Sequence, residues 1–211
     1  MVFYPVLRMK KNLPAILVTL LAILMPLQAL CSDPGQKAHH YYLDDIGQFL
    51  PTIGGVALSA AGIQARHSVK ERLAVTLTSM TLCEAGVWTL KHTIHSTRPD
   101  GTDRHSFPSG HTARAFRGAE IVRTEFGWGW GAGAYAVAAG VGALRIHHHR
   151  HRFGDVAAGA AYGFLSARAA YWLLPLERKL FGWDKSTVTA MALPVCNLPG
   201  RTFGASVAIV F

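Results

Sequence analysis

Charge is scarce in this sequence. Only 16% of its 211 residues are Asp, Glu, Lys or Arg, while half of the residues are apolar. Ordinary globular chains carry about 25% charged residues. The low charge therefore favours a protein that is associated with a membrane. The length is sufficient for one domain with a hydrophobic core of its own.

Cysteine is also scarce. The three cysteines, Cys31, Cys83 and Cys196, form no CxxC pair and no spaced framework, which excludes a disulfide scaffold. One disulfide, such as Cys83 to Cys196, remains open. Cys31 follows Leu30 rather than a small residue, which disfavours attachment of a lipid at this thiol.

Acidic residues are outnumbered by basic ones. The chain has 12 Asp and Glu against 21 Lys and Arg, which gives a formal net charge of +9. A basic chain suits nucleic acid, an anionic membrane surface or a phosphorylated substrate. No recognition motif for DNA or RNA is present. We therefore expect no nucleic-acid partner and retain the membrane and the phosphorylated substrate.

The N-terminus has the pattern of a secretory signal or a first membrane anchor. Arg8, Lys10 and Lys11 precede an apolar run over 13–30. A basic segment followed by such a run is typical of a signal peptide, and the run is also long enough to span a bilayer. Whether residues 1–31 are cleaved stays open, but both alternatives place the following residues outside the cytoplasm.

Several apolar stretches predict helices near the minimum length for crossing a bilayer. We predict an all-α bundle of about five to six helices within residues 39–185, embedded in a membrane, with a soluble bundle as the alternative. Glu84 lies in one such stretch and is expected to face an arginine inside the bundle. The stretches are 43–65, 73–90, 128–144 and 156–174, and an amphipathic helix follows Gly110.

The last segment, 186–211, has a different character. Pro194, Pro199 and Gly200 interrupt it, and residues 203–211 alternate loosely between apolar and small or polar positions. This pattern predicts a short β-like tail.

Clusters of basic residues predict how the chain would be oriented in a membrane. One cluster lies at 8–11, one at 66–72 and one at 178–185. Basic loops favour the cytoplasmic side. If these clusters face the cytoplasm, the loops around 91–110 and 145–155 face the opposite side.

A histidine and an aspartate in the second of these loops have the spacing of a catalytic pair. His151 and Asp155 are four residues apart, and on a helix they would share one face. The carboxylate can then hold one imidazole nitrogen and direct the other as a nucleophile. Attack of histidine on phosphorus gives a phosphohistidine, which water later hydrolyses.

Other residues of the two loops suit a phosphate. Lys91, Arg98 and Arg145 supply cations for its oxygens. Ser109 and Gly110 lie at the start of the amphipathic helix, where backbone N–H groups and the helix dipole favour an anion. In the first turn of this helix, His111 is placed to protonate the leaving oxygen as a general acid.

Taken together, these motifs resemble the signature of the type 2 phosphatidic acid phosphatase superfamily. That signature has three parts: Lys, six residues and Arg-Pro; then Pro-Ser-Gly-His; then Ser-Arg, five residues, His, three residues and Asp. The first part is found at Lys91 to Pro99 and the second at Pro108 to His111. The third is found at Arg145, His151 and Asp155, with Leu144 where the family often has Ser.

The resemblance implies an α-helical bundle that needs no metal or other cofactor. It implies His151 as nucleophile, Asp155 as the residue that orients it and His111 as general acid. The phosphate would be held by Lys91, Arg98, Ser109, Gly110 and Arg145. The loop orientation then predicts a bacterial inner-membrane protein whose active site faces the periplasm.

Function and substrate are left with alternatives. The first hypothesis is a phosphatase for a lipid such as phosphatidic acid, a polyprenyl diphosphate, phosphatidylglycerophosphate or a lipid A-type glycolipid. A soluble periplasmic acid phosphatase is the second, ahead of a vanadate-dependent haloperoxidase and a non-catalytic membrane protein. The histidine run over 147–149 suggests a metal site, but it has no nearby cysteine and Asp155 is better used by His151. The oligomeric state stays open.

Overall fold

Six helices and one pair of strands make up the residues that the computed structural model describes, which are 42–183, 189–197 and 202–210. The predicted signal or anchor at 1–31 lies outside them. The chain divides into two units, Met1–Leu173 and Leu174–Phe211. The helices are α2 (Tyr42–Gly47), α3 (Leu50–Ala60), α4 (Val69–Thr93), α5 (Gly110–Phe126), α6 (Trp128–His147) and α7 (Phe153–Leu180).

The second unit contains the end of α7 and an antiparallel hairpin. Its strands are β1 (Thr189–Asn197) and β2 (Thr202–Val210), and the register pairs Thr189 with Val210. The hairpin occupies the segment for which the sequence predicts a β-like tail.

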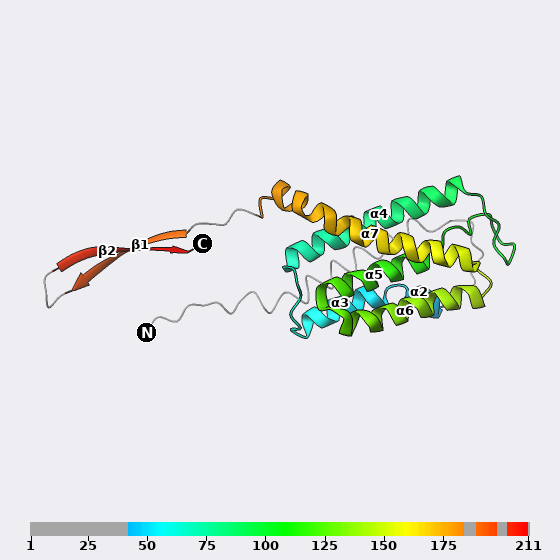
Figure 1. Cartoon of the computed structure of the whole chain (residues 1–211), viewed down its shortest axis with the longest axis horizontal. Helices are drawn as coiled ribbons and strands as arrows, with labels where there is room; N and C mark the ends of the chain where they lie inside the picture. Colours follow the sequence, from blue (N-terminus) through cyan, green and yellow to red (C-terminus); the bar gives the residue numbers. More distant parts are fainter. Residues whose placement is uncertain (1–41, 184–188, 198–201, 211) are drawn as a thin grey trace. The chain divides into compact units, whose positions relative to one another are not determined.

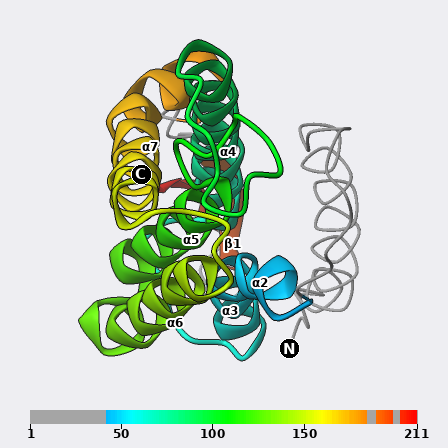
Figure 2. The ribbon, with the colours of Figure 1, turned by 90° about the vertical axis from the view of Figure 1, so that its right-hand side faces the viewer.

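In the first unit, α5 is the central helix. Figures 1 and 2 show it between α4 and α7 on one side and α3 and α6 on the other. Small side chains allow this close packing: Ala115, Ala119 and Ala138 are fully buried and pack with Val141 of α6 in one apolar cluster. The amphipathic helix predicted after Gly110 is therefore an internal helix of the bundle.

The approach of α7 to α5 depends on glycine. A Cβ atom on Gly163 would overlap the carbonyl oxygen of Ala113, and a Cβ on Gly159 would overlap that of Ser109. Gly159 thus lets the first turns of α7 lie directly against the start of α5. Both helix starts carry residues of the predicted site, so this contact fixes their separation.

We expect Gly163→Ala to destabilise the protein by about 1–3 kcal/mol, because the added methyl group must push α7 away from a backbone carbonyl. Gly140→Ala in α6 is the matched control, since a Cβ there meets no atom within 4 Å and alanine favours a helix. Thermal unfolding in detergent compares the two variants. A Gly163→Ala protein as stable as Gly140→Ala would contradict the close packing.

One predicted stretch is divided into two helices, while the other helices extend a few residues beyond the predicted bounds. The stretch 43–65 forms two helices, α2 and α3, with a turn at Gln48 and Phe49. The physical reason is Pro51, whose ring nitrogen cannot donate a hydrogen bond to a preceding turn. Gly62, with a φ of 82°, follows the end of α3. The break separates α2, which reaches the site, from the longer α3.

Helix α4 has a capped start and a long apolar stretch. Ser68 and Glu71 form a reciprocal capping box at its start. Among the described helices, α4 is the one long and apolar enough to cross a membrane. Inside the bundle, Glu84 of α4 accepts two hydrogen bonds of 2.7 Å from the Arg114 guanidinium, which confirms the predicted arginine partner. Cys83 is a buried free thiol.

Candidate active site

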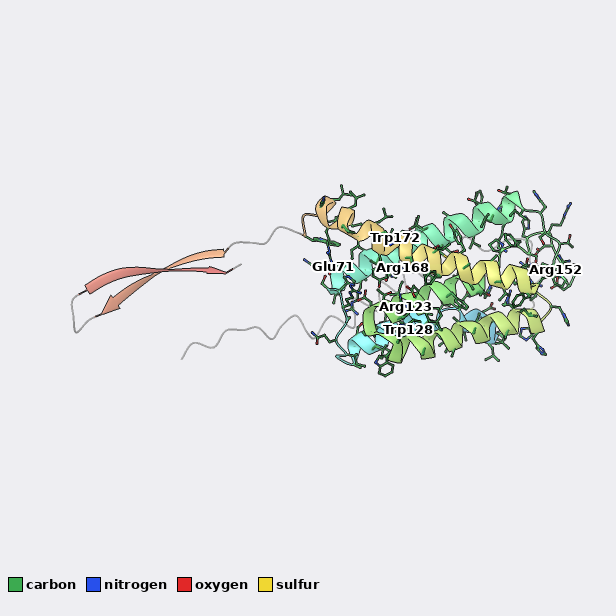
Figure 3. All side chains as sticks on the ribbon, in the orientation of Figure 1. Glu71, Arg123, Trp128, Arg152, Arg168 and Trp172 are labelled. Atoms are coloured by element: carbon green, nitrogen blue, oxygen red, sulfur yellow. The ribbon has the colours of Figure 1, made fainter. Side chains whose placement is uncertain are left out.

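The predicted site residues gather at one end of the first unit. They come from the end of α4, the loop after it, the start of α5, the end of α6 and the start of α7. Figure 3 labels Arg152, the neighbour of His151, at this end and Glu71 at the opposite one. The basic segment at 66–72 and the site therefore lie at opposite ends of α4, which at 1.5 Å per residue is about 37 Å long.

His151 is held as a neutral imidazole with a defined tautomer. Its ring is 3% exposed, and its Nδ1 lies 2.8 Å from the carbonyl oxygen of Ser106. A carbonyl only accepts, so Nδ1 carries the hydrogen and Nε2 carries the lone pair. Nε2 lies 3.4 Å from Nη1 of Arg98. The nitrogen that carries the lone pair therefore points at the Arg98 guanidinium, which the sequence predicts as a phosphate ligand.

Electrostatics keep this imidazole unprotonated. Burial is the main cause, and the charges of Arg98, Arg145 and Lys91 add to it, so the pKa of His151 lies well below its usual value. Protonation would remove the Nε2 lone pair. The cations that are predicted to hold a phosphate thus help to preserve this lone pair into the acid pH range.

Asp155 acts on His151 less directly than its spacing predicts. Its Oδ2 is 3.9 Å from Nδ1 of His151, too far for a hydrogen bond. This oxygen instead accepts from the hydroxyl of Ser106 at 2.5 Å and from the backbone N–H of Arg152 at 2.9 Å. The reason is that α7 begins only at Phe153, so His151 does not share a helix face with Asp155.

Ser106 is the residue that connects the two. Its hydroxyl donates to Asp155 while its carbonyl accepts from His151. The side chain is fully buried. Sequence reasoning missed Ser106; the signal available was its position just before the Pro108 to His111 motif.

The arginine of the first motif is fixed by a carboxylate. Nε of Arg98 donates to both oxygens of Asp103, at 2.8 and 2.7 Å, and Nη1 donates to the carbonyl of Arg150 at 3.3 Å. Burial opposes ionisation of Asp103, but the backbone N–H of His105 and the guanidinium of Arg98 hold its pKa below the usual value. Asp103 therefore stays charged and aims the guanidinium at His151.

The other two predicted cations also lie at the site. Nζ of Lys91 donates to the carbonyl oxygen of His105 at 2.6 Å. Nη1 of Arg145 lies 3.2 Å from Oδ2 of Asp44. Both charges lower the pKa of His151, so both lie within electrostatic reach of its imidazole.

The start of α5 has the geometry of an anion site. Ser109 is the N-cap and Gly110 the first helical residue. Helix geometry leaves the N–H groups of the first turn without intrahelical acceptors. The N–H of Ser109 itself donates to the carbonyl of Asp155 at 2.9 Å, and its hydroxyl pairs with that of Thr112 at 2.9 Å. Ser109 thus connects α5 to α7. The backbone N–H groups of the residues after it are left as donors for an anion.

His111 is paired with an acid that the sequence did not reveal. Its Nε2 lies 2.9 Å from Oδ1 of Asp45 in α2. Burial is the main reason why the pKa of His111 is lowered to about 4. The charges of Arg145 and Arg114 lower this pKa further, whereas Asp45 raises it. Asp44 and Asp45 were both passed over, and the available signal was two adjacent acids at the edge of an apolar stretch.

The histidine run over 147–149 does not gather into a cluster. His148 lies 2.8 Å from Oδ2 of Asp44 through its Nδ1, while His147 and His149 are exposed. Within 42–183 we find no group of three or more His, Cys, Asp or Glu side chains arranged to hold a metal ion.

Comparison with known proteins gives three findings. The family model described as the PAP2 superfamily matches residues 72–179. A Lipid A 1-phosphatase from Porphyromonas gingivalis is 33% identical over 147 residues, which are 67% of this chain and 33% of that protein. The chain thus spans about a third of the length of that relative. The crystal structure of Aquifex aeolicus LpxE superposes with a TM-score of 0.49 at 22% identity, covering 70% of this chain and 94% of that one.

Proposed function

The chain belongs to the PAP2 superfamily, and we propose that it is a lipid phosphatase that works through a phosphohistidine on His151. Membership of this family indicates a hydrolase of phosphate esters. The geometry of His151 carries the proposal for the mechanism: Ser106 holds the hydrogen on Nδ1, and Nε2 faces Arg98.

The reaction has two steps. In the first, Nε2 of His151 attacks phosphorus, the P–N bond forms, and the bond from phosphorus to the leaving oxygen breaks. Protonated His111 donates its proton to that oxygen, which leaves as an alcohol. In the second step, water attacks the phosphohistidine, the P–N bond breaks, and His111 takes a proton from the water. Inorganic phosphate is released and both histidines are restored.

The charges of the site support these two reaction steps. Lys91, Arg98 and Arg145 would neutralise the equatorial oxygens as negative charge shifts during transfer. The N–H groups after Ser109 would hold a further oxygen. Asp155 would support His151 through the hydroxyl and carbonyl of Ser106.

A lipid substrate fits the surface of the bundle. Large apolar side chains are exposed on helices that reach the site, including Trp88 of α4 at 53% and Phe153 of α7 at 76%. In a soluble protein such side chains are mostly covered, whereas a bilayer accepts them. The similarity to a Lipid A 1-phosphatase makes a phosphorylated glycolipid the first substrate to test, ahead of phosphatidic acid and polyprenyl diphosphates.

The proposed location rests on the apolar helix α4 and on the basic residues at its start. We propose that α4 spans the inner membrane with its basic start at the cytoplasmic side. The site at the other end of α4 would then face the periplasm. A periplasmic enzyme released by signal cleavage is the alternative.

Phosphate release from detergent-solubilised protein tests the function. We expect release from at least one of lipid A, phosphatidic acid and undecaprenyl diphosphate, unaffected by EDTA and inhibited by vanadate. Preference for a water-soluble ester over every lipid would favour the periplasmic acid phosphatase. Halide oxidation that appears with vanadate would replace the proposal by a haloperoxidase.

A further inference from the structure

Two adjacent carboxylates bring the short helix α2 to the active site. Asp44 and Asp45 lie in the first turn of α2, outside the three sequence motifs. They reach residues that are far away in the chain, since Asp45 and His111 are 66 positions apart and Asp44 and Arg145 are 101 apart. These contacts give α2 a role at the site that none of the motifs assigns.

Asp44 is the structural half of the pair. It is fully buried, and its Oδ2 lies 3.2 Å from Arg145 and 2.8 Å from Nδ1 of His148. A buried carboxylate is tolerated when cations or donors face it. Gly47, one turn later, packs against Val141 of α6. Asp44 therefore anchors α2 on the end of α6 and leaves Asp45 in a fixed position.

Asp45 contacts the proposed general acid. Its side chain is 45% exposed, while His111 is only 20% exposed, and Oδ1 lies 2.9 Å from Nε2 of His111. An ionised carboxylate can only accept, so Nε2 carries a hydrogen. Nδ1 is then the second nitrogen of the ring, and it carries a transferable proton when the ring is an imidazolium.

We propose that Asp45 is a positioning residue that orients His111 and stabilises its protonated form for donation to the leaving oxygen. This role rests on the proposed function, because it requires His111 to act as the general acid.

The charges around His111 explain why such a residue is needed. Burial disfavours the imidazolium, and the cations Arg145 of α6 and Arg114 of α5 disfavour it further. His151 is also close enough for the two histidines to influence each other electrostatically. Asp45 is the carboxylate that opposes these effects. Without it, the imidazole would hold its proton only at a lower pH, and at neutral pH less enzyme would carry the proton that the leaving oxygen needs.

The test compares Asp45→Asn with wild type over pH 3–8, a range that includes the pKa of about 4 of His111. We expect kcat at pH 7 to fall about tenfold with little change in KM, and the alkaline limb of the kcat profile to move to lower pH by about one unit. The sign follows from the role of His111: a general acid loses activity as pH rises through its pKa, and Asp45→Asn lowers that pKa. Asp45→Glu keeps the carboxylate and should recover part of the loss.

A double-mutant cycle distinguishes positioning of His111 from a general structural effect. In a His111→Gln background, Asp45→Asn should cause no further loss. Glu71→Gln makes the same chemical change at the far end of α4 (Figure 3) and serves as the matched control with unchanged kcat. An equal loss from Asp45→Asn in both backgrounds, or an increase in kcat, would overturn the proposal. The increase would mean that Asp45 withholds the proton from the leaving oxygen.

NMR titration of the histidines provides a readout that does not depend on turnover. The signal that disappears in His111→Gln identifies His111, and Asp45→Asn should move its midpoint to lower pH. An unchanged midpoint would overturn the proposal even if activity fell. A shifted midpoint in a protein that releases no phosphate would instead contradict the proposed function while leaving the contact with Asp45 intact.

Discussion

His151→Gln is expected to reduce phosphate release by about a thousandfold or more, with KM changed far less, because the variant lacks the atom that forms the P–N bond. Glutamine keeps a polar side chain of similar size beside Ser106 and Arg98. The measurement is initial-rate release of phosphate from the best lipid substrate, with EDTA present. His92→Gln serves as the matched control, since His92 is exposed and bonds to the carbonyl of Trp88.

The intermediate itself should be visible in the wild type. Rapid acid-free quenching with a ³²P-labelled substrate is expected to leave label on the protein, stable in base and lost in acid, as for a phosphoramidate. The label should be absent from His151→Gln. Activity that survives this substitution, or that EDTA abolishes, would exclude the mechanism and redirect attention to the histidines at 147–149.

The low pKa of His151 adds a pH criterion to this prediction. Burial and the nearby cations keep Nε2 unprotonated as the pH falls below the usual histidine range. The nucleophile should therefore not limit the reaction at mildly acid pH. Loss of wild-type activity as the pH falls through the ordinary histidine value of about 6.5, in an enzyme whose turnover His151→Gln abolishes, would contradict this expectation. It would show that the surrounding cations are neutralised in the working enzyme.

The sequence was sufficient to predict those residues whose relation is local or whose spacing is distinctive. Lys91, Arg98 and Arg145 do lie at one end of the bundle with His151, because the loop over 94–109 and the short connection over 148–152 both lie at that end. The helices themselves follow from apolar stretches, and the break after α2 follows in retrospect from Pro51.

What could not be predicted depends on contacts between distant segments. No spacing rule connects Asp45 with His111 or Asp44 with Arg145, because these pairs meet only when α2 packs against α5 and α6. The connection from Asp155 to His151 was also misjudged, since the i to i+4 rule assumes a helix that begins two residues before the observed start of α7. A backbone carbonyl, such as that of Ser106, has no signature in a sequence at all.

Arg98→Lys is expected to lower kcat/KM by about a hundredfold or more, even though the positive charge is retained. Arg98 is 5% exposed, and its guanidinium makes contacts on two sides. Its Nε donates to Asp103, while its Nη1 lies near the carbonyl oxygen of Arg150 and Nε2 of His151. A lysine has a single nitrogen at its tip, so it can neutralise Asp103 or reach the phosphate but cannot do both. The loss of activity in Arg98→Lys should therefore appear mainly in kcat, because the charge that develops on the transferring phosphoryl group must be neutralised in this step.

Arg104→Lys is the matched control, since Arg104 belongs to the same loop but is exposed. Kinetics of the two variants on one lipid substrate, together with vanadate inhibition, separate the effects of charge and geometry. Weaker vanadate inhibition of Arg98→Lys, with Arg104→Lys unchanged, is the expected pattern, because vanadate also needs the oriented fork. Arg98→Lys with near-normal kcat/KM would show that Arg98 contributes only its charge. The contact between its Nη1 and Nε2 of His151 would then have no role in the reaction.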